Sequence, residues 1–220
     1  SPELVIPELV RDYRIDRVET SRTPGNYERR TLEILGERLR VPLKVHGSDT
    51  LFLERDLPFP LTDLPAHFTP FRNQVEDLAF TPPLPAPDRL PPPLAVRFDG
   101  LPGAEAAPHT ALPVRGGSAA GQRRLRQFIF DQLSIMKYKE TRNCLDGLDG
   151  SSTISPWLAN GCLSPRQVAA AIQRFEREQV ANESTYWLYF ELLWREFFHW
   201  RALADDINLF RLRAGRGRAK

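Results

Sequence analysis

In a strongly apolar stretch, residues 184–204, three of the charged side chains could do chemistry. Glu191, Arg195 and Glu196 lie among eight aromatic residues. A buried charge is costly unless it is paired or used. Glu191 and Arg195 stand four residues apart and share one face of a helix, where they either pair with each other or face a ligand. In the second case Trp194 adds an aromatic surface beside them, and the residues alone leave both interpretations open.

A second group of polar residues precedes a short apolar run. Tyr138–Arg142 is followed by Ser151–Ser155 and then by Pro156. Hydroxyl groups and free backbone amides in front of a helix form a site that attracts anions. A serine-rich turn with ordinary helix capping has the same composition. Chemistry alone favours neither interpretation.

The composition limits the other possibilities. Hydrophobic residues make up 41% and charged residues 26% of the 220 residues, as in ordinary globular proteins. A net charge of +2 is too small to indicate a nucleic-acid binder without clustering of charge. Cys144 and Cys162 match no metal-ligand spacing and no disulfide framework, so we expect no metal and a reducing compartment. No apolar run approaches the roughly 20 residues that span a bilayer.

Helix and strand signals alternate over residues 1–56. We expect a helix over 2–13, an extended piece over 16–19, a helix over 27–39 and a strand over 41–45. This order predicts part of a parallel α/β layer that continues upstream of Ser1. The next segment, 57–115, holds fourteen of the twenty prolines. Because proline interrupts helices and strands, we expect an extended connector, ordered where its phenylalanines need burial and a linker after about Pro82.

Helical signals fill residues 116–220. Ser118, Ser155, Ser164 and Ser184 stand where helices begin, and Ser164 forms a capping box with Gln167. The final helix, 185–204, is aromatic on nearly every side, which is typical of the centre of a large helical domain. We therefore expect the chain to stop inside that domain.

Several long motifs together resemble DASH-type cryptochromes of the photolyase/cryptochrome family. The helical motifs are Tyr138–Asn143, Ser155–Ala159, Gly161–Arg166, Ser184–Trp187 and Phe190–Glu196. The connector motifs are Asp56–Phe59 and Phe68–Arg72. They cover nearly the whole chain in the order and spacing of that family.

The resemblance implies a fold of class α/β plus all-α. Residues 1–56 would be the tail of a Rossmann-like antenna domain, 57–115 the interdomain connector, and 116–220 the first helices of a helical domain that binds FAD. Contacts to FAD would come from seven residues: Tyr138, Ser151, Ser152, Thr153, Ile154, Ser155 and Arg195. Glu191 and Trp194 would act as catalytic residues on a flipped-out pyrimidine dimer, and Arg142, Glu191, Trp194 and Phe198 would contact DNA.

Parts of the family pattern lie elsewhere or differ. The later FAD-binding stretch and the electron-relay tryptophans would follow Lys220. A folate antenna (methenyltetrahydrofolate) uses a glutamate near the helix that starts at about Asn26, where this chain has Thr23-Pro24-Gly25. The loop Gly147–Gly150 also differs from the commoner family sequence.

For the parent protein the resemblance implies light-driven repair of cyclobutane pyrimidine dimers, in single-stranded DNA, by electron transfer from reduced FAD, and we expect this fragment alone to be inactive. The alternatives are a blue-light receptor or nucleic-acid-binding regulator without catalysis, and an inactive fragment. For the full-length protein we expect a monomer without membrane contact, in the bacterial cytoplasm or, in a eukaryote, an organelle.

Overall fold

A small parallel α/β layer forms the N-terminal part of the protein. The computed structural model describes residues 1–210 except 48, 86, 91, 93–113 and 145–148. Helix α1 (Pro2–Asp12) precedes strand β1 (Val18–Ser21), and α2 (Asn26–Arg38) connects β1 to β2 (Leu43–His46). The two strands pair in parallel with Val18 opposite Leu43, which confirms the predicted α/β arrangement. The first strand begins two residues later than the expected start at Asp16.

The described part of residues 47–115, called the connector from here on, buries apolar side chains in the core. It contains two short 3-10 turns, Glu54–Asp56 and Leu61–Asp63, and one eight-residue helix, α3 (Phe68–Val75). Phe68, Phe71 and Val75 of α3 are buried against the helical part. The predicted burial of the connector phenylalanines is thus confirmed for α3, and residues 93–113 of the expected linker lie outside the described part of the chain.

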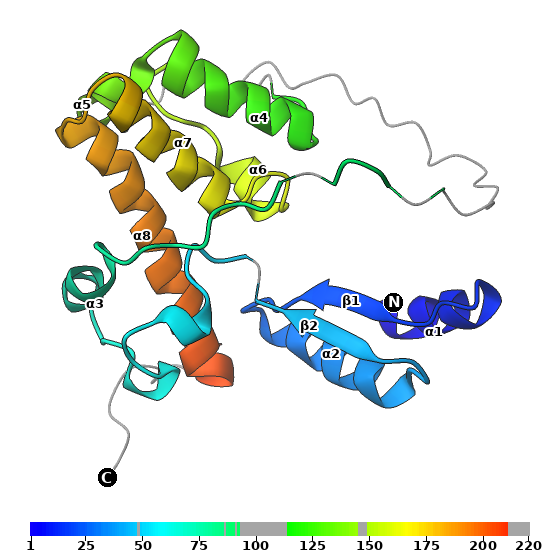
Figure 1. Ribbon diagram of the computed structural model, residues 1–220. Helices are drawn as coiled ribbons and strands as arrows, with labels where there is room; N and C mark the ends of the chain where they lie inside the picture. The colour runs from blue at the N-terminus through cyan, green and yellow to red at the C-terminus, as the bar shows by residue number, and fades with distance from the viewer. Residues whose placement is uncertain (48, 86, 91, 93–113, 145–148, 211–220) are drawn as a thin grey trace.

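The helical part is arranged around one long helix. Its elements are α4 (Ser118–Arg126), a π turn over Gln127–Asp131, a 3-10 turn over Ser134–Lys137, α5 (Tyr138–Thr141), α6 (Ser155–Ala159), α7 (Pro165–Glu178), α8 (Glu183–Asp205) and a final 3-10 turn over Asp206–Phe210. Figure 1 shows α8 in orange, with α3 on one side and α5 and α7 beside its upper half. Leu188, Leu193 and Trp200 of α8 are buried in the core that these helices share.

Three predicted helix caps are wrong, and the structure shows which residues replace them. Gly117, with φ of 89°, precedes α4, and Ile154 precedes α6, so Ser118 and Ser155 are instead the first helical residues. Only glycine adopts such a φ without strain. Gly117 therefore takes the capping position of α4, and Ser118 after it lies inside the helix. The box of Ser164 with Gln167 at α7 is confirmed.

The start of α8 is capped by Asn182 and not by Ser184. The Asn182 side chain accepts from the amide of Thr185 at 2.9 Å, and the Thr185 hydroxyl accepts from the amide of Asn182 at 3.0 Å. Ser184 is buried inside the first turn, where its hydroxyl accepts from the amide of Lys139 and donates to Glu140. Ser184 therefore joins α8 to α5. Within the described residues, no helix is long and apolar enough to cross a membrane.

Candidate functional site

A cleft of about 450 Å³ lies between the start of α6, α5 and the middle of α8. Its walls are formed by Tyr138, Ser151, Ser152, Thr153, Ile154, Ser155, Leu158, Ala159, Leu188, Glu191, Leu192 and Arg195. All seven residues that the sequence assigned to FAD line this one cleft, and Glu191 lines it as well. Arg142, Trp194 and Phe198 lie outside its lining.

Tyr138, the first residue of α5, lines the cleft. Its ring is nearly buried and meets Phe128 edge-on, with the ring centroids 5.8 Å apart. Burial raises the pKa of the Tyr138 phenol, and the nearby Glu191 carboxylate adds to this shift. A hydrogen bond with Ser152 acts in the opposite direction. Tyr138 is thus held neutral as a hydroxyl that donates and accepts hydrogen bonds beside the serine loop.

The serine loop, residues 151–155, is held from behind by Arg124 of α4. The Arg124 guanidinium donates to the carbonyl of Ser151 at 2.9 Å, to that of Ser152 at 3.1 Å and to the hydroxyl of Thr153 at 3.0 Å. Arg124 is only 6% exposed, and burial lowers the pKa of its guanidinium. Sequence reasoning missed Arg124, because it stands among other arginines on a helix that looks like a solvated surface.

The backbone of the serine loop has the shape of an anion-binding concavity. Thr153 has a left-handed φ of 52°, and the next residue, Ile154, is right-handed with φ of −83° and ψ of −8°. Successive residues of opposite hand turn their N–H groups toward one point. Within the described residues, no amide of the serine loop donates to another protein group. These free donors and the loop hydroxyls fit the phosphates of a dinucleotide.

Glu191 faces the cleft from α8 without pairing with Arg195. Its carboxylate lies 3.6 Å from the Arg142 guanidinium and accepts from the indole of Trp187 at 3.2 Å. The Glu191 side chain is 39% exposed and that of Arg142 is 27% exposed. Glu191 and Arg195 do not form the ion pair that their four-residue spacing allows, because Arg195 turns toward the connector.

Arg195 forms a wall shared by two clefts. It donates to the backbone carbonyl of Asp49 at 2.7 Å and lines the cleft described above. It also lines a second cleft of about 780 Å³, which lies between the helical part and the segment after β1. Thr23, Gly25 and Glu28 of that segment are among its lining residues.

Glu196, next to Arg195, holds two segments of the protein together. It is fully buried, and its carboxylate accepts from the amide of Leu51 in the connector at 2.7 Å. Burial raises the pKa of Glu196 to about 7, while the hydrogen bond to Leu51 and the charge of Arg195 limit the shift. Glu196 therefore fastens the connector to α8 and does not line the first cleft.

The aromatic residues assigned to the substrate form a stack with Phe68 of α3. The Trp194 ring lies 3.7 Å from that of Phe68 in α3 and nearly parallel to it, and 5.5 Å from Phe198. Trp194 is partly buried, whereas Phe198 is 61% exposed. The stack thus presents an open aromatic edge at Phe198.

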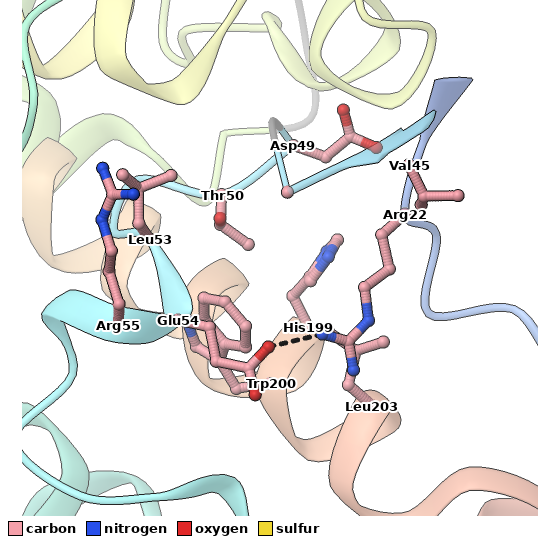
Figure 2. Close-up of a pocket in the computed structure, with 11 residues that line it drawn as sticks. Arg22, Val45, Asp49, Thr50, Leu53, Glu54, Arg55, His199, Trp200 and Leu203 are labelled. Carbon is pink, nitrogen blue, oxygen red and sulfur yellow. Dashed lines mark hydrogen bonds and ion pairs between the residues drawn. The ribbon is translucent and has the colours of Figure 1, made fainter. Parts of the chain in front are cut away.

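A third, smaller pocket of about 270 Å³ lies where β2, the connector and the end of α8 meet (Figure 2). Figure 2 shows Arg22 and Glu54 joined by an ion pair across it, with His199 and Trp200 of α8 at its back. Burial lowers the pKa of His199 to about 4, and the charge of Arg195 adds to this shift. The pocket walls therefore hold a neutral imidazole at neutral pH.

Comparisons with known proteins agree with this architecture. The sequence model of the family described as DNA photolyase matches residues 1–88. A curated Cryptochrome DASH of Vibrio parahaemolyticus is 46% identical over 167 residues, which cover 76% of this chain and 37% of that protein. The Cryptochrome DASH of Gloeobacter violaceus is 39% identical over 95% of this chain and 44% of its own length. The crystal structure of the Synechocystis cryptochrome superposes with a TM-score of 0.80 at 36% identity, covering 96% of this chain and 46% of that one.

The fold is that of the photolyase/cryptochrome class. The chain belongs to this family, and the curated relatives it matches are Cryptochrome DASH proteins. It spans less than half the length of these relatives.

Proposed function

We propose that the protein is a blue-light flavoprotein that holds FAD in the cleft between α5, α6 and α8. The observation that carries the proposal is the convergence of a phenol, several hydroxyls and unpaired amides on one concavity, with a buried guanidinium behind it. Ser151–Ser155 would hold the FAD phosphates, Tyr138 would donate a hydrogen bond beside them, and Arg195 would lie against the flavin. When bound, reduced FAD supplies an electron after it absorbs light.

We propose further that the substrate is a cyclobutane pyrimidine dimer, preferentially in single-stranded DNA. A damaged base is extruded into a pocket and stacks on aromatic side chains. Trp194 and the exposed Phe198 offer that surface, and Glu191 accepts hydrogen bonds on the same helix. Arg142 would contact the phosphate backbone, and its weak pairing with Glu191 leaves it free to exchange partners. The Arg142 guanidinium lies 4.7 Å from the centre of the Trp187 ring, which keeps it beside this surface.

The second cleft fits an antenna pigment such as a folate. Sequence reasoning found no glutamate at residues 23–26, but Glu28 of the first turn of α2 lines this cleft and lies directly over Gly25. A glutamate one turn later than expected thus supplies an acidic group there. We infer that Glu28 is the acidic contact of an antenna molecule, and Glu28→Ala would then lose a co-purifying pigment while keeping its flavin.

Light-dependent repair is the experiment that tests the proposed function. The protein is purified at the full length that its relatives have, mixed with a short oligonucleotide that contains one thymine dimer, reduced, and illuminated with blue light, with a dark sample as the control. We expect bound flavin by absorbance and loss of the dimer only under light, faster in single strands than in duplex. Bound flavin without repair would instead identify a photoreceptor, and absence of flavin binding would refute the proposal.

A further inference from the structure

The guanidinium of Arg124 donates hydrogen bonds to the serine loop, mainly to its backbone carbonyls. Its side chain is buried, and it reaches the carbonyls of Ser151 and Ser152 together with the hydroxyl of Thr153. The negative charge of Asp149 raises the pKa of the Arg124 guanidinium, against the lowering caused by burial. A buried guanidinium with three hydrogen bonds to one loop fixes the orientation of the peptide groups in that loop.

Peptide geometry then determines where the amides point. In a planar trans peptide the C=O and the following N–H point in opposite directions. Because the carbonyls of Ser151 and Ser152 point at Arg124, the amides of Ser152 and Thr153 point away from it. Both residues line the cleft, and Arg124 does not. The guanidinium thus turns two N–H donors toward the cleft.

The charge of Arg124 adds to this effect. It lies at the negative ends of two peptide dipoles whose positive ends face the cleft, so it raises the potential where an anion would bind. The helix that follows, α6, has only five residues, and its own dipole is correspondingly small. The left-handed Thr153 completes the concavity.

We propose that Arg124 is the positioning residue that makes the serine loop selective for a pyrophosphate group. It acts from outside the cleft by fixing the amides of Ser152 and Thr153 and by placing a buried positive charge behind them. The inference rests on the proposed function, since the pyrophosphate is that of FAD. It assigns the anion selectivity of the site to a residue that does not touch the cofactor.

The test compares three ligands on four forms of the protein. Dissociation constants for FAD, inorganic pyrophosphate and riboflavin are measured by titration for the wild type, Arg124→Gln, Arg124→Lys and Arg126→Gln. Arg126 lies on the same helix with an exposed side chain and is the matched control. We expect Arg124→Gln to weaken FAD and pyrophosphate about tenfold to a hundredfold, with a shallower dependence on salt. Arg124→Lys keeps the charge without the planar fork and should fall between, while riboflavin and the Arg126 variant should match the wild type.

Other outcomes would overturn the inference in distinguishable ways. If Arg124→Gln binds all three ligands like the wild type, or loses riboflavin as much as FAD, Arg124 has no selective role. If the wild type binds riboflavin but not pyrophosphate, the flavin site stands and the inference fails. If it binds none of them, the proposed function fails first. If Arg124→Gln does not fold, an NMR titration of the wild type still tests the inference. Pyrophosphate should shift the amide signals of Ser152 and Thr153, and unchanged signals would refute the inference.

Discussion

Glu191 and Glu196 lie five residues apart on α8 and differ in what surrounds them. Glu191 is at the rim of the cleft, partly exposed, with Arg142 and Trp187 as its neighbours. Glu196 is enclosed, and its carboxylate binds the backbone of the connector at Leu51. One side chain is thus placed to meet a ligand and the other to hold the protein together.

The substitution Glu191→Gln should separate these roles. The amide oxygen of the introduced side chain still accepts from Trp187, and the ion pair with Arg142 is exposed enough to contribute at most about 1 kcal/mol to the free energy of unfolding. We expect the variant to keep its flavin and to lose no more than about 2–4 °C in melting temperature. Dimer repair per absorbed photon should fall severalfold, because a fixed negative charge is replaced by a neutral amide donor at the substrate.

A thermal melt and a repair yield measured on one preparation give both quantities. Arg142→Gln is the matched control for the melting temperature alone, since it removes the same ion pair from the other side and leaves the Glu191 carboxylate in place. A large loss of melting temperature together with an unchanged repair yield would assign Glu191 a structural role.

The substitution Glu196→Gln should change how stability depends on pH. The pKa of Glu196 is about 7 in the folded protein against an ordinary value of 4.5, so the folded state binds its proton more tightly. The stability that this proton provides is complete below pH 4.5 and is lost as the pH rises through 7. The difference in unfolding free energy between Glu196→Gln and the wild type should therefore move by about 3 kcal/mol in favour of the variant from pH 4 to pH 8.

Urea denaturation of both proteins at several pH values measures this difference. The comparison at each pH is necessary because His199, whose pKa is lowered to about 4, acts in the opposite direction and is present in both. A carboxyl NMR titration of Glu196 gives an independent check. A parallel course of the two stability profiles would show that Glu196 ionises without cost.

At the scale of the elements, the start of α8 offers a measurable capping contribution. Asn182→Ala removes the acceptor for the amide of Thr185 and should lower the free energy of unfolding by about 1 kcal/mol. Asn182→Ser keeps a capping oxygen and should lose only part of that amount. Chemical denaturation of the three proteins measures the effect, and equal losses in the Ala and Ser variants would mean that Asn182 acts through other contacts.

The order of the elements was predictable from sequence, but their first residues often were not. Apolar spacing predicted α2 and β2 to within two residues, because burial of one face leaves a periodic pattern. Several residues before a helix can cap it, and the choice depends on tertiary partners. Ser184 looked like a cap, yet its hydroxyl is used by Lys139 and Glu140 of α5. No sequence pattern around position 184 shows those partners.

The candidate site, too, could be predicted only in part from the sequence. Residue type and family motifs brought Tyr138, Ser151–Ser155, Glu191 and Arg195 together before the structure placed them in one cleft. The partners of Glu191 and Arg195 could not be predicted, because they come from residues 142 and 49, far away in the chain. Burial of Arg124 was equally invisible, since it depends on a loop 27 residues later.

At the scale of the whole molecule, α8 connects everything that the proposals require. Arg195 belongs to both larger clefts, and Glu196 holds the connector one residue later. Beyond the end of the helix, Asp206 contacts Asn26 and Arg29 of α2. A light-absorbing pigment in the second cleft and a flavin in the first would therefore share Arg195 of α8 as a common wall.

The same helix exposes an apolar edge with consequences for the chain in solution. Phe198 is 61% exposed and continues the aromatic stack of Trp194 and Phe68, so its exposure extends an existing apolar surface. Such surfaces promote association unless something covers them.

We expect this chain of 220 residues to self-associate as its concentration rises. Phe198→Ser should raise the dissociation constant of self-association about tenfold or more, since burying a phenylalanine is worth about 1.5–3 kcal/mol. Tyr27→Ser is the matched control, because Tyr27 on α2 is 84% exposed and stacks on no other ring in the described part of the chain. Light scattering across a dilution series measures the association of all three proteins. Equal association of the wild type and Phe198→Ser would show that the chain does not associate through this aromatic edge.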